Sequence, residues 1–241
     1  PNTRVQVLDT GAGLRIGSSE VAPDTHTVLL MHLNNDTTDY SGHGNNGTRY
    51  GGVDWISTGT WKTIGGTEYI LSFDGTDDRV EIANESNFDF EYTQPLSIEA
   101  WFKTSADGYA LVAKMKDDTD SYRGYDLIMS AGNVYLQIIN TWSSNAIARY
   151  TTSTFNDGNW HHVVGVYDGS GTNAGITIYV DGKKQAVENQ VAGPLTATIL
   201  NNHPVTIGSR YGVTYFNGLI DEVRILDRAL TAEEVAADYY S

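Results

Sequence analysis

The segment from Asp39 to Gly47 has the residue types of a loop that could hold a hard metal ion. It reads Asp-Tyr-Ser-Gly-His-Gly-Asn-Asn-Gly. Glycine and asparagine tolerate a left-handed backbone, so such a segment can curl and turn several carbonyl oxygens inward. Calcium takes six to eight oxygen ligands from carboxylates, amides and carbonyls. An EF-hand is excluded because its register of alternating acidic residues is missing. The composition fits either a calcium loop or an ordinary polar turn.

A second set of residues could hold a sugar. An aromatic ring packs against the C–H face of a sugar, while polar neighbours bind the sugar's hydroxyl groups. Trp142 lies at the end of an expected strand, and several tyrosines lie in segments rich in glycine, serine and threonine: Tyr109, Tyr122, Tyr125, Tyr211 and Tyr215. The alternative for each of these rings is that it fills the space between two sheets.

The residues that could support catalysis are sparse. A retaining glycosidase needs two carboxyl groups about 5–5.5 Å apart. The nearest candidate run is Glu81–Glu85, in which the middle position is Ala83 and not an acid. His161 and His162 are adjacent on an expected strand, so they point to opposite faces and cannot share a metal ion. Serine-hydrolase, zinc-protease and P-loop motifs are absent from the sequence.

Composition excludes several classes of protein. The 241 residues include 15 Lys and Arg against 30 Asp and Glu, a formal net charge of −15, and no cysteine. Without cysteine there is no disulfide framework, thiolate zinc site or cysteine nucleophile. Phosphate backbones are bound by clustered Lys and Arg, so the charge argues against a nucleic-acid partner. No apolar run approaches the roughly 18 residues of a membrane span, so membrane insertion is not expected.

The elements that must position these residues are short strands. Apolar and polar residues alternate with period 2 in Leu96–Lys103, Val134–Ile138, Trp160–Tyr167, Ile176–Val180 and Leu219–Leu226. About ten to twelve such runs, separated by turn residues, predict an all-β sandwich or barrel. Asp181-Gly182 predicts a hairpin turn, and Thr231-Ala232-Glu233-Glu234 predicts a capped C-terminal helix.

Residues 1–26 are less regular. Arg4–Leu8 and Leu14–Ile16 could form a strand pair before a linker. We interpret residues 1–26 as an N-terminal extension, which either packs on the domain or pairs with a neighbouring subunit. Because the chain starts at Pro1, we expect a processed or excised protein.

Ordered blocks from residue 27 to the end resemble a known family. They are Leu29–Leu33 leading to Asp39–Gly47, then Leu71–Gly75, Leu96–Phe102, Asn159–Val163, Ile178–Gly182, Phe216–Ile225 and Arg228–Glu234. Together they resemble the laminin-G-like jelly rolls of the concanavalin A-like lectin/glucanase superfamily. The resemblance implies an all-β, two-sheet antiparallel jelly-roll sandwich with one short C-terminal helix, over residues 27–241.

The resemblance also implies a structural calcium ion, held by the first loop and the last strand. Transferred by position, its ligands would come from Asp39, Ser41, His43, Asn46 and Asp221. Such an ion would stabilise the folded state by binding it preferentially.

The first functional hypothesis is an extracellular or cell-surface, non-catalytic module that binds a glycan or glycoprotein. Secretion and a place on a virion surface both fit it. The expected ligand-binding residues are Lys114, Tyr125, Trp142, Arg149 and Tyr211. The alternative is a structural or adhesive domain of a fibre, filament or virion appendage, with residues 1–26 contacting neighbouring subunits. A glycoside hydrolase or polysaccharide lyase ranks third, because Ala83 breaks the carboxylate motif of the family's laminarinase-like enzymes.

Overall fold

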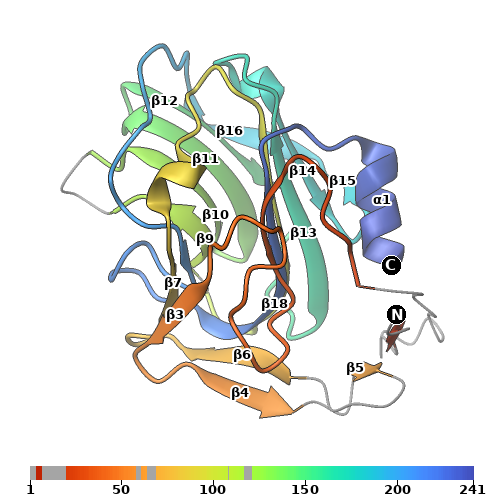
Figure 1. The fold of residues 1–241 in the computed structure, drawn as a ribbon. Coiled ribbons are helices and arrows are strands. Elements are labelled where there is room, and N and C mark those ends of the chain that lie inside the picture. Colours follow the sequence, from red (N-terminus) through yellow and green to blue (C-terminus); the bar gives the residue numbers. More distant parts are fainter. Residues whose placement is uncertain (1–3, 7–19, 58–60, 64–68, 108, 117–120) are drawn as a thin grey trace.

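The protein is a sandwich of two antiparallel sheets, seen here in a computed structural model (Figure 1). The structure describes residues 4–6, 20–57, 61–63, 69–107, 109–116 and 121–241. Two short 3₁₀ helices, η1 (Glu85–Phe88) and η2 (Asn173–Gly175), and one α-helix, α1 (Ala232–Tyr240), complete the described elements. The predicted all-β jelly-roll architecture with one C-terminal helix is confirmed. Among the described residues, no helix is both long and apolar enough to cross a membrane.

The first sheet has eight strands, which follow one another in the order β16-β12-β11-β10-β9-β17-β7-β3. Their bounds are β16 (Val187–Ala192), β12 (Asn145–Thr151), β11 (Asn133–Thr141), β10 (Gly124–Ser130), β9 (Ala110–Lys114), β17 (Thr206–Ile207), β7 (Arg79–Ile82) and β3 (Gly47–Tyr50). Strands β9 to β12 pair antiparallel with their neighbours and form the broadest continuous part of this sheet.

The second sheet has the order β15-β14-β13-β8-β18-β6-β4, and β2 also pairs with β18. Its strands are β15 (Lys183–Lys184), β14 (Ile176–Val180), β13 (Trp160–Tyr167), β8 (Leu96–Lys103), β18 (Asn217–Leu226), β6 (Tyr69–Asp74), β4 (Asp54–Ser57) and β2 (Thr27–Met31). The predicted Asp181-Gly182 turn joins β14 to β15, and both turn residues adopt positive φ angles, 52° and 71°. These angles suit the tight hairpin that the sequence signals.

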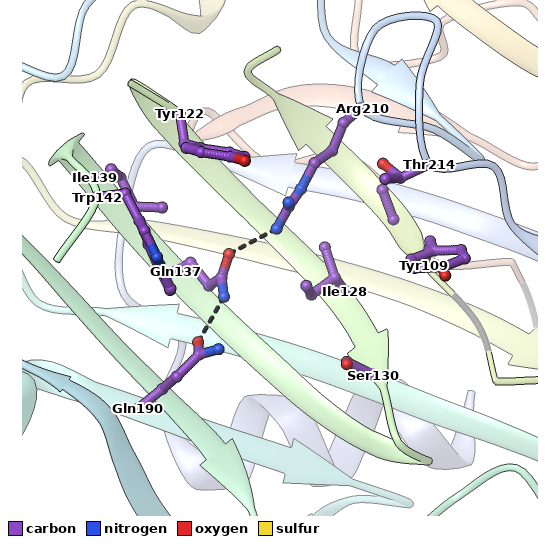
Figure 2. Close-up of a pocket in the computed structure, with 11 residues that line it drawn as sticks. Tyr109, Tyr122, Ile128, Ser130, Gln137, Ile139, Trp142, Gln190, Arg210 and Thr214 are labelled. Carbon is purple, nitrogen blue, oxygen red and sulfur yellow. Dashed lines mark hydrogen bonds between the residues drawn. The ribbon is translucent and has the colours of Figure 1, made fainter. Parts of the chain in front are cut away.

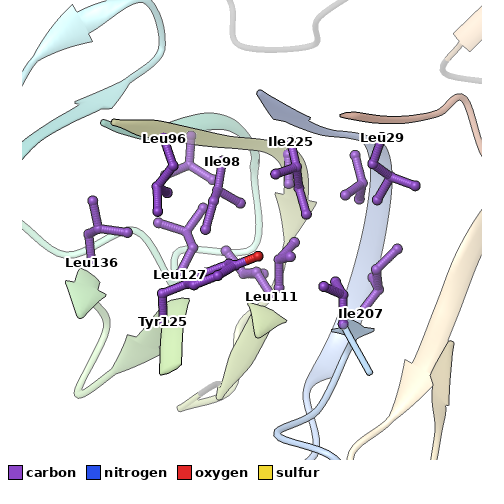
Figure 3. Packing of buried hydrophobic residues seen from close by; sticks show 14 of the residues in the cluster. Leu29, Leu96, Ile98, Leu111, Tyr125, Leu127, Leu136, Ile207 and Ile225 are labelled. Atoms are coloured by element: carbon purple, nitrogen blue, oxygen red, sulfur yellow. The ribbon is translucent and has the colours of Figure 1, made fainter. Parts of the chain in front are cut away.

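The hydrophobic core lies between the two sheets. Figure 3 shows Leu29, Leu96, Ile98 and Ile225 of the second sheet facing Leu111, Leu127 and Leu136 of the first. All seven side chains are fully buried. Alternate residues of each strand enter this layer, which is why the period-2 pattern in the sequence located the strands.

Helix α1 covers part of the outer face of the second sheet. Its predicted capping box is confirmed: Thr231 Oγ1 accepts from the Glu234 N–H, and the Glu234 carboxylate accepts from the Thr231 N–H. Trp101, which points away from the core, stacks on Tyr239 of α1 with 5.6 Å between ring centroids and is only 4% exposed. Trp101 is therefore a packing residue, and its ring is not exposed to contact a ligand.

The N-terminal extension pairs with a strand of the same chain. Strand β1 (Arg4–Gln6) is antiparallel to β5 (Trp61–Thr63). The strand partner that the sequence suggested for β1, residues 14–16, lies outside the described residues. The 1–26 boundary and the contact of this segment with neighbouring subunits stay predictions.

His161 and His162 point to opposite sides of β13, as predicted. The imidazole of His161 lies between Asp181 and Asp157, with N···O distances of 2.9 and 3.2 Å, whereas His162 lies 2.6 Å from Glu99. Burial alone would lower the pKa of His161, but the hydrogen bonds and charges of Asp181 and Asp157 raise it above the ordinary value of 6.5. Each histidine thus contacts carboxylates within the fold.

The raised pKa of His161 predicts a pH-dependent contribution to stability. A group whose pKa is higher in the folded state stabilises most below its unfolded pKa and loses that effect as the pH rises through its folded pKa. We expect His161→Asn to reduce the free energy of unfolding more at pH 5.5 than at pH 8.5, measured by urea denaturation. The exposed imidazole of His43 supplies a matched control, His43→Asn, for which little change is expected at either pH. An equal loss for His161→Asn at both pH values would contradict the prediction.

Candidate functional site

A hollow of about 260 Å³ lies on the outer face of the first sheet, away from the core and from α1 (Figure 2). Strands β9, β10 and β11 form its floor, where Ala110, Ile128 and Ile139 are at most 7% exposed. The rest of its wall is polar or aromatic: Tyr109, Tyr122, Ser130, Gln137, Trp142, Gln190, Arg210 and Thr214. The outer face of the other sheet is partly covered by α1, so this hollow is the strongest candidate site among the described residues.

A chain of hydrogen-bonded side chains crosses the hollow. Arg210 Nε donates to Asp126 Oδ2 at 2.7 Å, and a terminal guanidinium nitrogen of Arg210 donates to Gln137 Oε1 at 2.7 Å. Gln137 Nε2 in turn donates to Gln190 Oε1 at 2.6 Å (Figure 2). Asp126 is completely buried beneath Arg210, so its charge balances that of the guanidinium. The hollow therefore offers fixed hydrogen-bonding groups with little net charge.

Two aromatic rings stand at one side of this polar chain. The ring centroids of Tyr122 and Trp142 lie 6.2 Å apart at an interplanar angle of 56°, and the Arg210 guanidinium lies 5.9 Å from the centre of the Tyr122 ring. The backbone N–H of Trp142 donates to the backbone carbonyl of Ser121, which ties the two loops together. Ser121 and Tyr122 both have left-handed φ angles, 58° and 63°. This tight turn lets Tyr122 lie over the hollow.

The hollow combines an apolar floor, aromatic rings and convergent amide and guanidinium groups. Such a set binds a ligand that has both a C–H face and hydroxyl groups. Among the described residues that line the hollow none is a carboxylate, and the buried Asp126 beneath it is paired with Arg210. The arrangement is suited to binding.

Only one of the five predicted sugar-contacting residues, Trp142, lines the hollow. Tyr125 is 1% exposed and lies between the sheets, where its hydroxyl donates to the Phe88 carbonyl at 3.1 Å. Arg149 is half-buried, and its guanidinium donates to the carbonyl of Ile176 at 3.2 Å. Tyr211 is not among the residues that line the hollow, and its ring lies 5.4 Å from that of His203. The structure thus does not place Tyr125 or Arg149 where they could contact a ligand at this site.

Lys114 is a buried structural cation. Its side chain is 1% exposed, and its ammonium group lies 2.8 Å from a Glu85 carboxylate oxygen and 3.0 Å from one of Asp89. It also donates to the carbonyls of Asn201 and His203. Lys114 therefore ties η1 to the segment before β17 and does not face a ligand. One carboxylate oxygen of Glu85, a residue considered for catalysis, is engaged in this contact.

Asp39 organises the loop that was predicted to bind calcium. Its carboxylate accepts four hydrogen bonds, from the N–H groups of Leu30, Ser41 and Asn45 and from the Ser41 hydroxyl, at 2.7–3.1 Å. A carboxylate has about four lone-pair sites, so protein donors already occupy them. The Asn46 side-chain oxygen likewise accepts from the Asp39 N–H at 2.9 Å.

The other predicted ligands do not complete a calcium site. His43 is exposed on the loop, and Asp221 is buried on β18 opposite Trp101 of β8. Among the described residues, neither of them belongs with Asp39 to a group of three acidic or histidine side chains close enough to share a metal ion. In this arrangement the loop residues do not fit a calcium ion, because one would have to displace the donors of Asp39. Calcium stays a prediction from the family resemblance.

Removal of the Asp39 carboxylate separates the two explanations of this loop. We expect Asp39→Ala to lower the free energy of unfolding by about 1–3 kcal/mol, since it leaves three buried or half-buried N–H groups without their acceptor. The loss should be equal in calcium and in EDTA. Asp54→Ala, at an exposed carboxylate that accepts one hydrogen bond from Trp55, is the control and should change stability by about 0.5 kcal/mol or less. A loss for Asp39→Ala that appears only with calcium would support metal ligation instead.

Sequence reasoning missed the polar residues of the hollow. Gln137 alternates with the core residues Leu136 and Ile138, so its phase on the strand did indicate the outer face. Arg210 and Gln190 come from distant parts of the chain, and no local pattern joins them to Gln137. Their convergence depends on the pairing of β16 at the edge of the first sheet and on the path of the loop after β17.

Comparisons with known proteins identify the family and the fold. The model of the concanavalin A-like lectin/glucanases superfamily matches residues 74–236. The chain belongs to this family. No curated protein sequence matches the chain.

Solved structures share the fold. The binding domain of Paraclostridial Mosquitocidal Protein 1 matches with a TM-score of 0.64 and 18% identity, over 89% of this chain and 52% of that one. The binding domain of botulinum neurotoxin serotype G gives 0.65 and 14%, over 89% and 50%. Domain 4 of AbnA, an extracellular arabinanase from Geobacillus stearothermophilus solved with arabinotriose, gives 0.56 and 17%, over 90% and 98%. This member of the concanavalin A-like family therefore spans about half of the matched toxin domains and nearly all of the arabinanase domain.

Proposed function

We propose that this protein is a non-catalytic carbohydrate-binding module that holds its ligand in the hollow on the first sheet. The observation that carries the proposal is the Tyr122–Trp142 pair standing beside the Arg210–Gln137–Gln190 chain, over an apolar floor. Aromatic rings would pack on the C–H face of a sugar, and the amide and guanidinium groups would bind its hydroxyls. In this proposal Asp126 acts through Arg210, because it holds the guanidinium in place.

The comparisons support a binding role. The matched toxin structures are described as binding domains, and the arabinanase domain is described in complex with a trisaccharide. At 14–18% identity these likenesses concern the fold, so the ligand class rests on the hollow itself. We also propose that the protein acts outside the cell, as the arabinanase does.

The test is a glycan array probed with the purified protein, in calcium and in EDTA. We expect a signal on at least one neutral glycan and loss of that signal in Tyr122→Ala, with the fold checked by circular dichroism. The EDTA arm separates calcium-dependent from calcium-independent binding. If a folded protein binds no glycan in either buffer, carbohydrate binding is wrong.

A further inference from the structure

A second pair of aromatic rings lies on the same face as the hollow. Tyr135 of β11 and Tyr150 of β12 are directly opposite in the strand register, and their rings stack with centroids 5.1 Å apart at an interplanar angle of 21°. Both side chains are partly exposed. Because alternate residues of a strand share a face, Tyr135 points to the same side as Gln137 and Ile139, which line the hollow.

The tyrosine pair adjoins the hollow directly. Tyr135 is the register partner of Ile128, a floor residue of the hollow, so Ile128, Tyr135 and Tyr150 form one row across three strands. Tyr135 also packs against the same outer apolar cluster as Trp142. The exposed aromatic surface therefore continues from the hollow onto β12 without a break in the sheet.

The Tyr122–Trp142 pair of the hollow and the Tyr135–Tyr150 pair form two aromatic platforms, which stand far apart along β11. From Tyr135 to Thr141, the residue before Trp142, the strand advances six residues, or about 20 Å at the usual rise per residue. A single sugar ring cannot contact both platforms. Gln137 lies between them and presents its amide to the hollow.

The charges along this face favour an uncharged ligand. In the hollow, Arg210 is balanced by the buried Asp126. At the other platform the Tyr150 hydroxyl donates to Glu188 at 2.8 Å, and the charge of Asp107, after burial, helps to raise the pKa of Tyr135. Carboxylates next to the tyrosine pair would repel a polyanionic chain.

We infer that the ligand is a segment of an uncharged, linear polysaccharide several sugar units long, lying along β11 from Trp142 to the Tyr135–Tyr150 pair. This inference rests on the proposed function and adds to it the class and length of the ligand. Tyr135 and Tyr150 then contact sugar units beyond those held in the hollow. A chain end is not required, because the tyrosine platform is an open, half-exposed surface.

The test is the dependence of affinity on chain length. Calorimetric titrations would use arabino-, laminari- and xylo-oligosaccharides of two to six units. In the series that binds, we expect the hexasaccharide to bind at least tenfold more tightly than the disaccharide. Tyr135→Ala and Tyr150→Ala should each remove most of that gain and leave disaccharide binding unchanged. Tyr135→Phe and Tyr150→Phe, which keep the rings, should retain the gain and so distinguish stacking from loss of fold.

Three outcomes would overturn the inference. Equal affinity for the disaccharide and the hexasaccharide would restrict the site to the hollow, and the proposed function would survive. Unchanged hexasaccharide affinity in both alanine variants would likewise restrict the site to the hollow and leave the proposed function standing. No binding at any length in all three series, with no neutral glycan bound on the array, would remove the inference and the proposed function together.

Discussion

Replacement of Arg224 by methionine is expected to lower the free energy of unfolding by about 3–5 kcal/mol, the usual cost of removing one partner from a buried ion pair. The Arg224 and Glu99 side chains are 6% and 5% exposed, and Arg224 Nε lies 2.7 Å from Glu99 Oε2. Without the guanidinium, the Glu99 carboxylate remains buried and keeps its contact with His162, but it loses its arginine partner. Arg224 also contacts Asp238, so its loss frees one attachment of α1 to the sheet.

The pH dependence of this effect has a defined sign. Burial would raise the pKa of Glu99, but Arg224 and His162 bring it below the ordinary value of 4.5. A carboxyl group with a lowered folded pKa stabilises above its unfolded pKa and loses that effect as the pH falls through the folded pKa. The difference between the native protein and Arg224→Met should therefore shrink below about pH 4.5.

Two further variants make the Arg224 result decisive. Arg79→Met removes a similar pair, Arg79–Glu81, whose side chains are 21% and 20% exposed, so about 1 kcal/mol or less is expected. The double variant Glu99→Gln/Arg224→Met should recover part of the loss, because it removes the buried Glu99 charge together with that of its partner. Urea denaturation at pH 7 measures all four proteins. Losses for Arg224→Met no larger than for Arg79→Met would show that the buried pair contributes little.

Replacement of Trp142 by alanine is expected to weaken glycan binding about 30-fold or more, which corresponds to about 2 kcal/mol. Trp142 is half-exposed at the edge of the hollow and lies after the last residue of β11, so its ring is not needed for the core. Its loss removes one of the two rings beside the polar chain. Stability should change far less than affinity.

The control for Trp142 is Tyr240→Ala. Tyr240 is 57% exposed at the end of α1, on the side of the second sheet. Its removal should leave glycan affinity unchanged, and calorimetry with the best glycan of the array measures both variants. Equal affinities for the Trp142→Ala variant and the native protein would place the binding site elsewhere.

The fold was predictable because its signals are local. The alternation in Leu96–Lys103 and Trp160–Tyr167 marks strands, and both segments are strands with these bounds. The Thr231–Glu234 capping box marks the start of α1 for the same reason: the interacting groups lie within one helical turn. Period 2 does not say, however, which face of a sheet meets solvent. Trp101 and Trp142 both belong to or follow a predicted strand, and the sequence pattern does not tell which ring is exposed. Helix α1 buries Trp101, whereas Trp142 lines the hollow on the other sheet.

The candidate site was only partly predictable. Trp142 was found because it ends a strand pattern, while Lys114 and Tyr125 were chosen by residue type and proved to be buried. An isolated lysine in a sequence does not reveal that Glu85 and Asp89 will surround it, because those contacts arise from packing between distant segments.

By itself the sequence determined the sandwich, the C-terminal helix and the absence of cysteine chemistry, since periodicity, capping and composition are local or additive properties. Its net charge argued against a nucleic-acid partner, which stays a prediction. Only the tertiary structure decided which sheet face is open and that Asp126, Gln137, Gln190 and Arg210 meet there. It also showed that hydrogen bonds occupy the Asp39 carboxylate. The residues of the hollow lie up to 84 positions apart in the chain, and such pairings are set by the strand order of the first sheet and by the path of the loop after β17.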